Sequence, residues 1–209
     1  MHLDPLRDGL LVVAGYLIGS IPVGVLVAKL TGGQDPRSVG SGRTGGTNAI
    51  RAMGPVRGVA VGILDIGKGF LAVMGARFLG ADDVVLAIVG IATVVGAWRS
   101  VFLGFHGGRG VATGIGAMLA LAPLAIILAT PVFFGAILVT RYVSLGSLLG
   151  TATVVGIVAL LVILGVSPPA VLLFGVISAG IVFLAHKDNI ARLLRGTERK
   201  VEFGSAPRG

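Results

Sequence analysis

The sequence predicts an all-helical membrane protein in which seven transmembrane helices form one bundle, and three observations support this fold class. The chain of 209 residues is 55% hydrophobic and only 12% charged, with a mean hydropathy of +0.99, whereas a soluble domain is about one quarter charged. Several apolar stretches approach the roughly 20 residues that a helix needs to cross the hydrocarbon core. The links between these stretches alternate between basic and non-basic. We treat residues 1–209 as a single membrane domain.

Apolar composition places the individual spans. We predict them at Gly9–Leu30, Gly58–Leu79, Val84–Ala97, Val111–Leu121, Leu124–Val139, Leu148–Val166 and Ala170–Ala185. Pro22 lies inside the first span and removes a backbone hydrogen bond, so a kink is expected there. The fourth stretch has eleven residues, which is about 17 Å of helix against roughly 30 Å of hydrocarbon. Pro123 follows it, so this region is either two helices, the first of them short, or one long kinked helix.

The distribution of Lys and Arg predicts the orientation, because positively charged links stay on the cytoplasmic side. Four such residues lie in 31–57, two in 98–109, one at position 141 and six after His186, against none in 80–83, 122–123 and 167–169. This alternation predicts an external N-terminus and a cytoplasmic C-terminus, with 186–209 as a cytoplasmic tail. Topology and attraction to anionic lipid then explain the net charge of +8, and no nucleic-acid binding is expected.

The polar stretch Ser38–Arg51 collects glycines, hydroxyl side chains, an amide and two arginines in an otherwise apolar chain. Glycine lets backbone N–H groups approach a ligand, and successive N–H groups form concave anion sites. The guanidinium fork suits phosphate oxygens. The stretch is therefore either a phosphate cradle at a membrane face or a flexible, solvated loop. Its candidate ligands are Ser41, Gly42, Arg43, Gly45, Thr47, Asn48 and Arg51.

Three further polar segments fall in links assigned to the same side. The turn His106–Gly110 precedes a short helix, so it is either an anion site at a helix N-terminus or a tight interhelical turn. Ser144 and Ser147 begin a span and either bind a ligand or cap the helix. His186 and Asn189 share a helical face, where the histidine is a general base, a phosphate donor or a solvated residue. The turn contributes the candidate ligands Gly107, Gly108, Arg109 and Gly110.

Two charged residues within a span, and the lack of cysteine and of known cofactor motifs, limit the kinds of site that the chain can form. Asp65 and Lys68 interrupt the second span, and we interpret them as a buried ion pair because unpaired charges at membrane depth are costly. The chain has no cysteine, which excludes disulfides, thiolate metal sites and a cysteine nucleophile. It has no phosphate loop, dinucleotide fingerprint or metal-spaced cluster. We expect neither a metal nor a cofactor, and no cleavable signal peptide, because the N-terminus lacks a basic region.

The ordered motifs resemble the PlsY family of bacterial acyl-phosphate:glycerol-3-phosphate acyltransferases along nearly the whole chain. The matching stretches are Tyr16–Gly24, Val39–Asn48 with Arg51, Leu64–Gly69, Gly107–Thr113, Arg141–Leu145 and His186–Glu198. The resemblance implies a seven-helix enzyme of the inner (plasma) membrane with a cytoplasmic active site. It would transfer a fatty acyl group from acyl phosphate to the 1-hydroxyl of glycerol 3-phosphate, giving lysophosphatidic acid and phosphate, without a metal or a covalent acyl-enzyme. This is the first step of phospholipid synthesis.

The resemblance also implies roles for particular residues. Phosphate and glycerol groups would be held by Ser41, Arg51, Arg109, Ser147, His186 and Asn189. Asn48 and the glycine-rich backbone would orient the acyl phosphate, and Ser144 and Glu198 belong to the substrate-binding set. The proton of the attacking hydroxyl would pass either to His186 or to a phosphate oxygen of the substrate. We favour the substrate, because no buried carboxylate is suitably placed in the sequence.

The chain departs from the family pattern at several positions. Arg43 stands where Asn is usual, Arg109 where Lys is usual, and the segment Ala97–Ser100 where a histidine and an aromatic-proline pair are typical. His106 also stands where a basic residue is common. A catalytically weak paralogue is therefore one alternative. A transporter or channel for a small phosphorylated anion is another, since broken helices with glycine-lined N-termini also occur in transporters.

Overall fold

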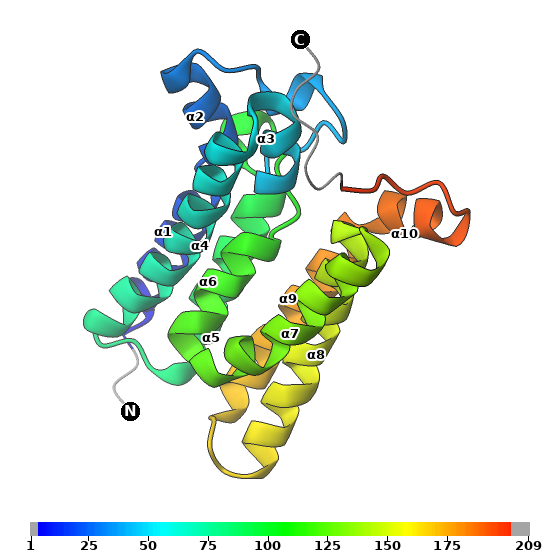
Figure 1. Cartoon of the computed structure of the whole chain (residues 1–209). Helices are drawn as coiled ribbons and strands as arrows, with labels where there is room; N and C mark the ends of the chain where they lie inside the picture. Colours follow the sequence, from blue (N-terminus) through cyan, green and yellow to red (C-terminus); the bar gives the residue numbers. More distant parts are fainter. Residues whose placement is uncertain (1–3, 202–209) are drawn as a thin grey trace.

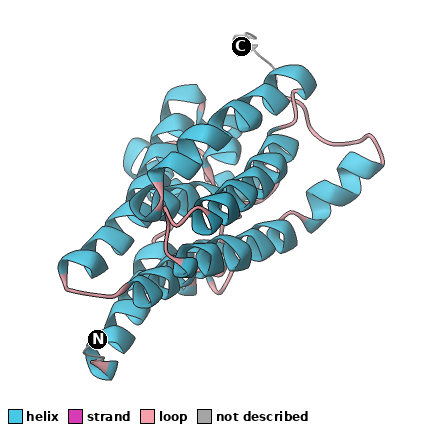
Figure 2. Ribbon diagram, turned by 90° about the horizontal axis from the view of Figure 1, so that it is seen from below, coloured by secondary structure: helices cyan, strands magenta, loops and turns pink. Residues whose placement is uncertain are grey.

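The computed structural model describes residues 4–201, and within that range the chain is entirely helical, without a strand (Figure 2). This confirms the predicted all-α fold class. The helices are α1 (Pro5–Ser20), α2 (Val23–Thr31), η1 (Pro36–Ser38), α3 (Gly46–Met53), α4 (Pro55–Phe78), α5 (Asp83–Trp98), η2 (Val101–Leu103), α6 (Val111–Leu121), α7 (Pro123–Thr140), α8 (Val143–Ile163), α9 (Pro169–Ala185) and α10 (Lys187–Leu194). The start of α1 and the whole of α10 lie at opposite ends of the bundle (Figure 1).

Four of these helical segments are long and apolar enough to cross a membrane: α4, α5 continued through η2, α7 and α8. Two bent pairs also pass this test when each is counted as one span, α1 with α2 and α9 with α10. The described residues therefore offer four to six spans of full length, which fits a polytopic membrane protein. The remaining predicted span corresponds to α6, whose eleven residues make an apolar but short helix.

The first span breaks at its predicted proline, and α1 and α2 are bent by 44° there. Side chains from other segments donate to the carbonyl oxygens that lack a helical donor at this break. Ser100 Oγ donates to the carbonyl oxygen of Ser20 at 2.6 Å, and Lys68 Nζ donates to that of Ile21 at 3.1 Å. Lys68 Nζ also lies 2.7 Å from Asp65 Oδ1. The predicted ion pair is thus confirmed, and it ties α4 to the broken first span.

The structure decides between the two alternatives around Pro123 and adds a helix to the segment 31–57. A break at Ala122 and Pro123 separates α6 from α7, so this region is two helices with a short first member. The segment 31–57, interpreted as a loop, contains η1 and α3. In α3, Ala49 is fully buried and packs in a small apolar cluster with Val61 of α4. Sequence reasoning missed this helix because it is only eight residues long and half of them are polar or glycine.

The helices pack closely through glycine. α5 is central and contacts α1, α4, α6 and α9. Where α4 crosses α6, a Cβ added at Gly69 would collide with the carbonyl group of Thr113, and one added at Gly116 with the carbonyl group of Ile66. Small residues allow helix backbones to approach in this way inside a membrane, where packing rather than water exclusion drives association. The α4–α6 crossing therefore depends on the absence of side chains at these positions.

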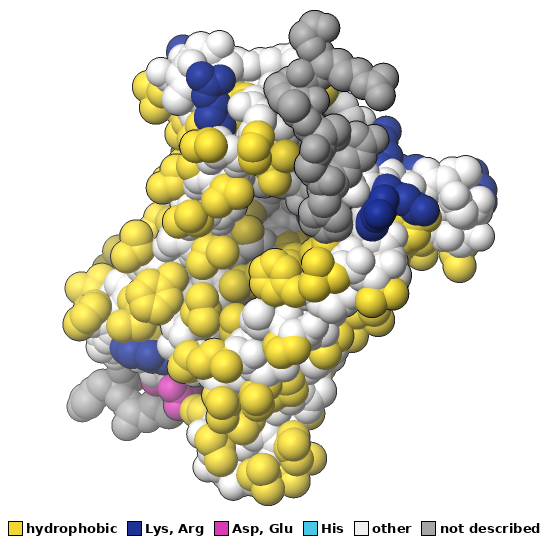
Figure 3. Space-filling model, viewed as in Figure 1, with side chains coloured by type: hydrophobic (Ala, Val, Ile, Leu, Met, Phe, Trp, Pro, Cys, Tyr) yellow, Lys and Arg dark blue, Asp and Glu magenta, His cyan; other side chains and the backbone are white. Residues whose placement is uncertain are grey.

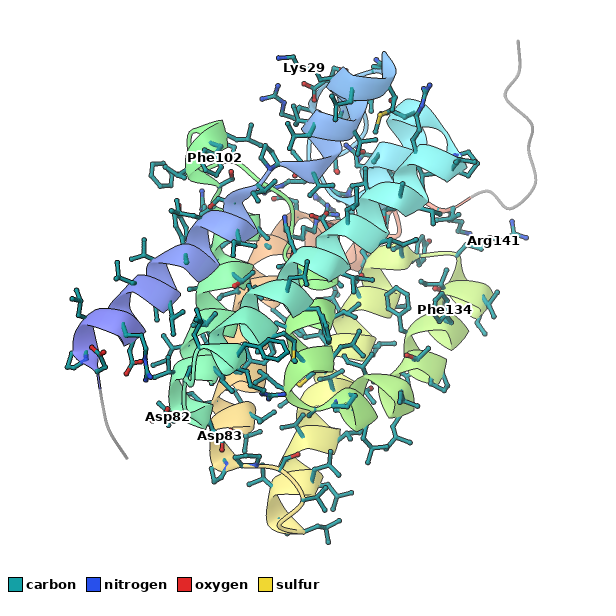
Figure 4. The ribbon with its side chains drawn as sticks, turned by 90° about the vertical axis from the view of Figure 1, so that its left-hand side faces the viewer. Lys29, Asp82, Asp83, Phe102, Phe134 and Arg141 are labelled. Atoms are coloured by element: carbon teal, nitrogen blue, oxygen red, sulfur yellow. The ribbon has the colours of Figure 1, made fainter. Side chains whose placement is uncertain are left out.

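The two ends of the bundle differ in charge. Lys29 and Arg141 lie near the end that carries α2 and α10, whereas Asp82 and Asp83 lie at the opposite end (Figure 4). Between the ends, hydrophobic side chains cover much of the surface in Figure 3, and large ones such as Leu138 are well exposed. This is the pattern of a bundle whose sides face lipid and whose ends face water.

We predict that Gly69→Ala destabilises the bundle while Gly67→Ala, two residues earlier on the same helix, does not. The new methyl group at position 69 would push against the α6 backbone, and overpacking of this kind costs about 1–3 kcal/mol. Gly67 has open space around its Cβ position, and Ala is the better helix former. Thermal unfolding in detergent would compare the two variants, and equal midpoints would contradict the close α4–α6 crossing.

Candidate active site

A cavity of about 600 Å³ lies between α4 and α6 on one side and α7, α8 and α9 on the other, under the loop that leads into α3. It brings together residues that are far apart in the sequence. The predicted site residues that line it are Ser41, Arg43, Gly45, Thr47, Asn48, Arg51, Gly107, Gly108, Arg109, Gly110, Ser144, Ser147, His186, Asn189 and Glu198. Gly42 is the exception, and it lies on the wall of a separate cavity. All the predicted site residues except Gly42 therefore line one cavity.

The same cavity is apolar at its other end. Ile63 of α4, Phe133 of α7, Val154 of α8 and Phe174 of α9 line it. A single space with a basic, polar end and an apolar end between lipid-facing helices suits a ligand with a charged group and a hydrocarbon chain.

Asn48 holds the loop above the cavity in shape. Its side chain is 3% exposed, and Nδ2 donates to the carbonyl oxygens of Pro36, Val39 and Arg43 at 2.6, 3.1 and 2.8 Å. Its Oδ1 accepts a hydrogen bond from the backbone N–H of Ser41 at 3.1 Å. The loop is thus an ordered cradle rather than a flexible segment, and both polar ends of the Asn48 amide are used to build it.

Left-handed glycines shape the loop before α3 and the turn before α6. Gly40 and Gly42 have φ values of +56° and +66°, and Gly110, directly before α6, has +77°. Residues with a side chain rarely adopt these angles, so glycine is required. The turn at Gly107–Gly110 is anchored by a hydrogen bond from the Gly108 N–H to the carbonyl oxygen of Ala97 at 2.8 Å. The cradle and the turn thereby present backbone to the cavity without an intervening side chain.

Arginines converge on the polar end of the cavity without matching carboxylates. Burial, followed by the charge of Arg43, lowers the pKa of Arg109 to about 10. Burial, followed by the charge of Arg199, lowers the pKa of Arg51. Within residues 4–201, neither Arg51 nor Arg109 forms an ion pair. Both remain protonated at neutral pH, so the cavity holds mutually repelling positive charges that an anion would stabilise.

The carboxylate of Glu198 is already occupied by other side chains. Oε1 accepts hydrogen bonds from Ser144 Oγ at 3.0 Å and from Asn189 Nδ2 at 2.6 Å, and Oε2 accepts one from Arg192 Nε at 2.7 Å. The segment after α10 therefore folds back and joins α8 to α10. Glu198 lines the cavity, and its hydrogen bonds hold the side chains of Ser144 and Asn189 in place.

The two serines at the start of α8 do not cap that helix, which corrects one of the sequence-based interpretations. Tyr142 occupies the N-cap position, and its side chain makes no capping hydrogen bond. Ser144 binds Glu198 instead, and Ser147 Oγ donates back to the carbonyl oxygen of Val143 at 2.9 Å. Both hydroxyl oxygens face the cavity and can still accept hydrogen bonds there.

His186 is a buried, neutral base candidate. Its Nδ1 lies 2.8 Å from the carbonyl oxygen of Val182, and since a carbonyl oxygen only accepts, Nδ1 carries the proton. Burial is the main reason that the pKa of His186 falls from 6.5 to about 4, and the charges of Arg109 and Arg43 act in the same direction. At neutral pH, Nε2 is therefore a free acceptor on the cavity wall.

The buried polar atoms that lack a hydrogen-bond partner all belong to residues that line this cavity. Within residues 4–201 they are Ser20 Oγ, Ser41 Oγ, Arg109 Nε, Ser178 Oγ and Asn189 Oδ1. An unsatisfied buried polar group costs about 1–3 kcal/mol, and a partner from a bound ligand removes that cost. Three of these atoms, in Ser41, Arg109 and Asn189, come from predicted site residues, so the cavity wall offers polar atoms that a bound ligand could satisfy.

Sequence reasoning missed some cavity residues. Arg199 was treated only as part of a basic tail, and Ser178 lies in a span without any motif that would single it out. Asp65 and Lys68 were interpreted as structural, and they also line the cavity. No group of three His, Asp or Glu residues in the described chain is arranged to hold a metal ion.

The chain is similar in sequence and in fold to known proteins. The family model described as glycerol-3-phosphate acyltransferase matches residues 9–196. The glycerol-3-phosphate acyltransferase of Geobacter sulfurreducens is 39% identical, and the match covers 93% of this chain and 98% of that protein. That of Trichlorobacter lovleyi is 44% identical, and the match covers 92% of this chain and 97% of that protein. The crystal structure of PlsY, an integral membrane glycerol 3-phosphate acyltransferase, in its glycerol 3-phosphate form superimposes with a TM-score of 0.85 at 39% identity, covering 93% of this chain and 96% of that one. Its lysophosphatidic acid form gives a TM-score of 0.82 at 36% identity, covering 93% and 95%.

We predict that His186 stays uncharged at neutral pH with its proton on Nδ1. The ¹⁵N NMR spectrum of histidine-labelled protein in detergent reports both charge and tautomer, and a His186→Asn variant assigns the signal. Because the unfolded chain takes up this proton first, the stability that neutral His186 maintains above pH 6.5 is lost as the pH falls towards 4. A His186 signal that titrates near pH 6.5 would contradict the buried, neutral ring.

Proposed function

Because the chain belongs to the glycerol-3-phosphate acyltransferase family, we propose that it transfers a fatty acyl group from acyl phosphate to the 1-hydroxyl of sn-glycerol 3-phosphate. Acyl transfer to glycerol 3-phosphate, a reaction of phospholipid synthesis, is the activity of this family of integral membrane enzymes. Acyl phosphate as the donor, the 1-hydroxyl as the acceptor and the residue roles below are our proposals. The products are lysophosphatidic acid and inorganic phosphate.

The observation that carries the proposal is the convergence of Arg43, Arg51 and Arg109 in a cavity whose other end is apolar. Both substrates carry a phosphate group, and a site for two such groups requires several cations close together. The acyl chain of the donor then has an apolar space between α4, α6, α7 and α8. A soluble phosphate and a lipid can thus meet in one place.

The proposed reaction requires the protein to position its two substrates, and it requires no nucleophile from the protein. Acyl phosphate is a mixed anhydride, so the 1-hydroxyl oxygen attacks its carbonyl carbon, a new ester C–O bond forms and the bond from that carbon to the phosphate oxygen breaks. Arg51 and Arg109 would bind the departing phosphate and the phosphate of the acceptor, and hydroxyl and backbone donors such as Ser41 would stabilise the oxyanion. The electron pair of the broken bond leaves with the phosphate.

The hydroxyl proton has two possible acceptors in this proposal. Asp65 is paired with Lys68, and Glu198 accepts three hydrogen bonds, so neither carboxylate is a free base. We favour a phosphate oxygen of the substrate, with neutral His186 Nε2 accepting a hydrogen bond from the glycerol and orienting it. Asn189, held by Glu198, would act beside it.

For the topology we propose seven passes in the inner membrane, with an external N-terminus, a cytoplasmic C-terminus and the active site at the cytoplasmic face. The passes are the bent α1–α2 pair, α4, α5, the short α6, α7, α8 and α9, and α10 belongs to the cytoplasmic tail. The arginine-rich end of the cavity lies at the same end of the bundle as the basic links, which supports a cytoplasmic site. Family membership also favours an enzyme over the transporter that the broken helices had left open.

We predict that Arg51→Ala and Arg109→Ala each reduce phosphate release from palmitoyl phosphate in the presence of glycerol 3-phosphate by about 100-fold or more, because each removes a charge-assisted donor from the cavity wall. Arg77→Ala is the matched control, since Arg77 lies near the opposite end of α4, away from the cavity. Palmitoyl coenzyme A is expected to give no turnover in place of palmitoyl phosphate. Wild-type rates in both cavity variants, or equal rates with both donors, would contradict the proposal.

We also predict that a reporter fused after residue 209 is active only as a cytoplasmic reporter. Green fluorescent protein fluoresces when folded in the cytoplasm, and alkaline phosphatase is active only when exported, so the pair gives opposite readouts. A fusion with active alkaline phosphatase and dark fluorescent protein would reverse the proposed orientation.

A further inference from the structure

A second cavity, of about 610 Å³, shares Arg43 and Gly107 with the main cavity. Its wall comes from the cradle loop, the end of α5, the turn before α6 and the junction of α9 with α10. The residues that line it are Gly42, Arg43, Trp98, Arg99, His106, Gly107, Leu184, Lys187 and Asp188. Only Arg43 and Gly107 also line the main cavity, so most of this site has no part in the proposed acyl transfer.

The second cavity is basic. Arg43, Arg99 and Lys187 contribute three positive charges against one negative charge from Asp188, and in the part of the chain that the structure describes none of these four side chains forms an ion pair. His106 adds an imidazole ring whose Nδ1 lies 2.7 Å from the carbonyl oxygen of Gly104. Excess positive charge in a cavity attracts an anion.

Arg99 is held in an orientation suited to phosphate. Its guanidinium carbon lies 4.5 Å from the ring centroid of Trp98, in a cation–π contact. Such a contact occupies the face of the guanidinium group and leaves donors at its edge for a bidentate phosphate contact. Nη1 also makes a long hydrogen bond of 3.5 Å to the carbonyl oxygen of Phe105.

Apolar side chains beside the cavity are exposed as if to lipid. Phe102, Phe105 and Leu184 are 57%, 56% and 63% exposed, and Phe102 points away from the bundle in Figure 4. Phe105 has a φ of +62°, an uncommon conformation for a bulky residue. The adjacent indole of Trp98 is a residue type enriched at the membrane–water interface. Charged groups next to exposed apolar groups match a phospholipid, with its phosphate in the cavity and its chains outside.

We propose that this second cavity binds the phosphate head group of an anionic membrane lipid. Arg99 and Lys187 hold the phosphate, Arg43 contributes charge from the shared wall, and the exposed side chains of Phe102, Phe105 and Leu184 contact the acyl chains. The proposal does not rest on acyl transfer, because its phosphate ligands Arg99 and Lys187 lie outside the main cavity and only Arg43 is shared. It also gives a common location to Arg43, Trp98, Arg99 and His106, which are among the positions where the sequence departs from the family pattern.

The experiment uses Trp98 as the reporter, since it is the only tryptophan of the chain. The full-length protein in lipid nanodiscs is titrated with phosphatidylglycerol that carries bromine near the top of its acyl chains, and in parallel with phosphatidylcholine brominated at the same positions. Brominated phosphatidylglycerol is expected to quench Trp98 fluorescence at a lower mole fraction than brominated phosphatidylcholine. Quenching is normalised to the unquenched signal of each variant, because Arg99 touches the indole.

The double variant Arg99→Gln/Lys187→Gln is expected to lose most of this preference. Its affinity for phosphatidylglycerol should fall by about fivefold for each basic residue removed near the membrane surface. The matched control Lys29→Gln/Arg195→Gln removes the same charge from exposed sites outside the second cavity and keeps the preference. Both variants are expected to retain acyl transfer, which shows that they fold. Equal quenching by both lipids, or an equal loss in both variants, would overturn the proposal. So would a Trp98 response to inorganic phosphate that abolishes the lipid preference, because the ligand would then be a free phosphate.

Discussion

Electrostatic repulsion among the arginines that line the main cavity is the constraint on which the rest of this structure depends. Arg43, Arg51 and Arg109 line one cavity. Burial and then the charge of Arg43 lower the pKa of Arg109, and burial and then the charge of Arg199 lower the pKa of Arg51. Such a cluster is unfavourable unless the backbone that carries it is fixed independently. The fold supplies that fixation without neutralising the charge: Asn48 closes the cradle loop through four hydrogen bonds, and the Gly108 N–H anchors the turn before α6. The positively charged guanidinium groups thereby remain available to bind the phosphate groups of the proposed substrates.

The carboxylates are arranged to preserve this imbalance. Asp65 is confined to Lys68, at the break in the first span, and Glu198 is confined to Ser144, Asn189 and Arg192. Each therefore stabilises the scaffold around the cavity without forming an ion pair with Arg51 or Arg109. A free carboxylate in the same place would compete with the substrate for the arginines and would cost affinity. Among residues 4–201, the two carboxylates that line the cavity, those of Asp65 and Glu198, are thus both engaged by other side chains, which fits the proposal of an already activated acyl donor.

The sequence predicted the structure best where a single property of the residues, such as hydropathy or the presence of proline, determines the local fold. Hydropathy and proline placed the helices and the breaks at Pro22 and Pro123, and the glycine, arginine and amide pattern identified residues that do share a cavity. It was least informative where tertiary contacts decide. The short helix α3 forms because Ala49 packs on α4, and the serines of α8 turn to Glu198 and Val143 instead of capping. Nothing in the local sequence indicates that Glu198, more than fifty positions away, would return to Ser144. For the same reason Arg199 and Ser178 could not be assigned to the cavity.

Arg43 couples the two cavities, and the direction of that coupling follows from its charge. It lies on the shared wall, and its charge is the largest contribution after burial to the lowered pKa of Arg109. A lipid phosphate in the second cavity would offset part of the Arg43 charge, relieve the repulsion felt by Arg109 and so reduce the electrostatic gain from binding a phosphate in the main cavity. Linkage makes this reciprocal, so a bound substrate weakens the lipid contact by the same factor. Asparagine, the usual residue at this position in the family pattern, carries no charge and would remove this electrostatic coupling. The substitution to arginine therefore adds positive charge to the catalytic cavity and at the same time makes that charge sensitive to the lipid at the membrane surface.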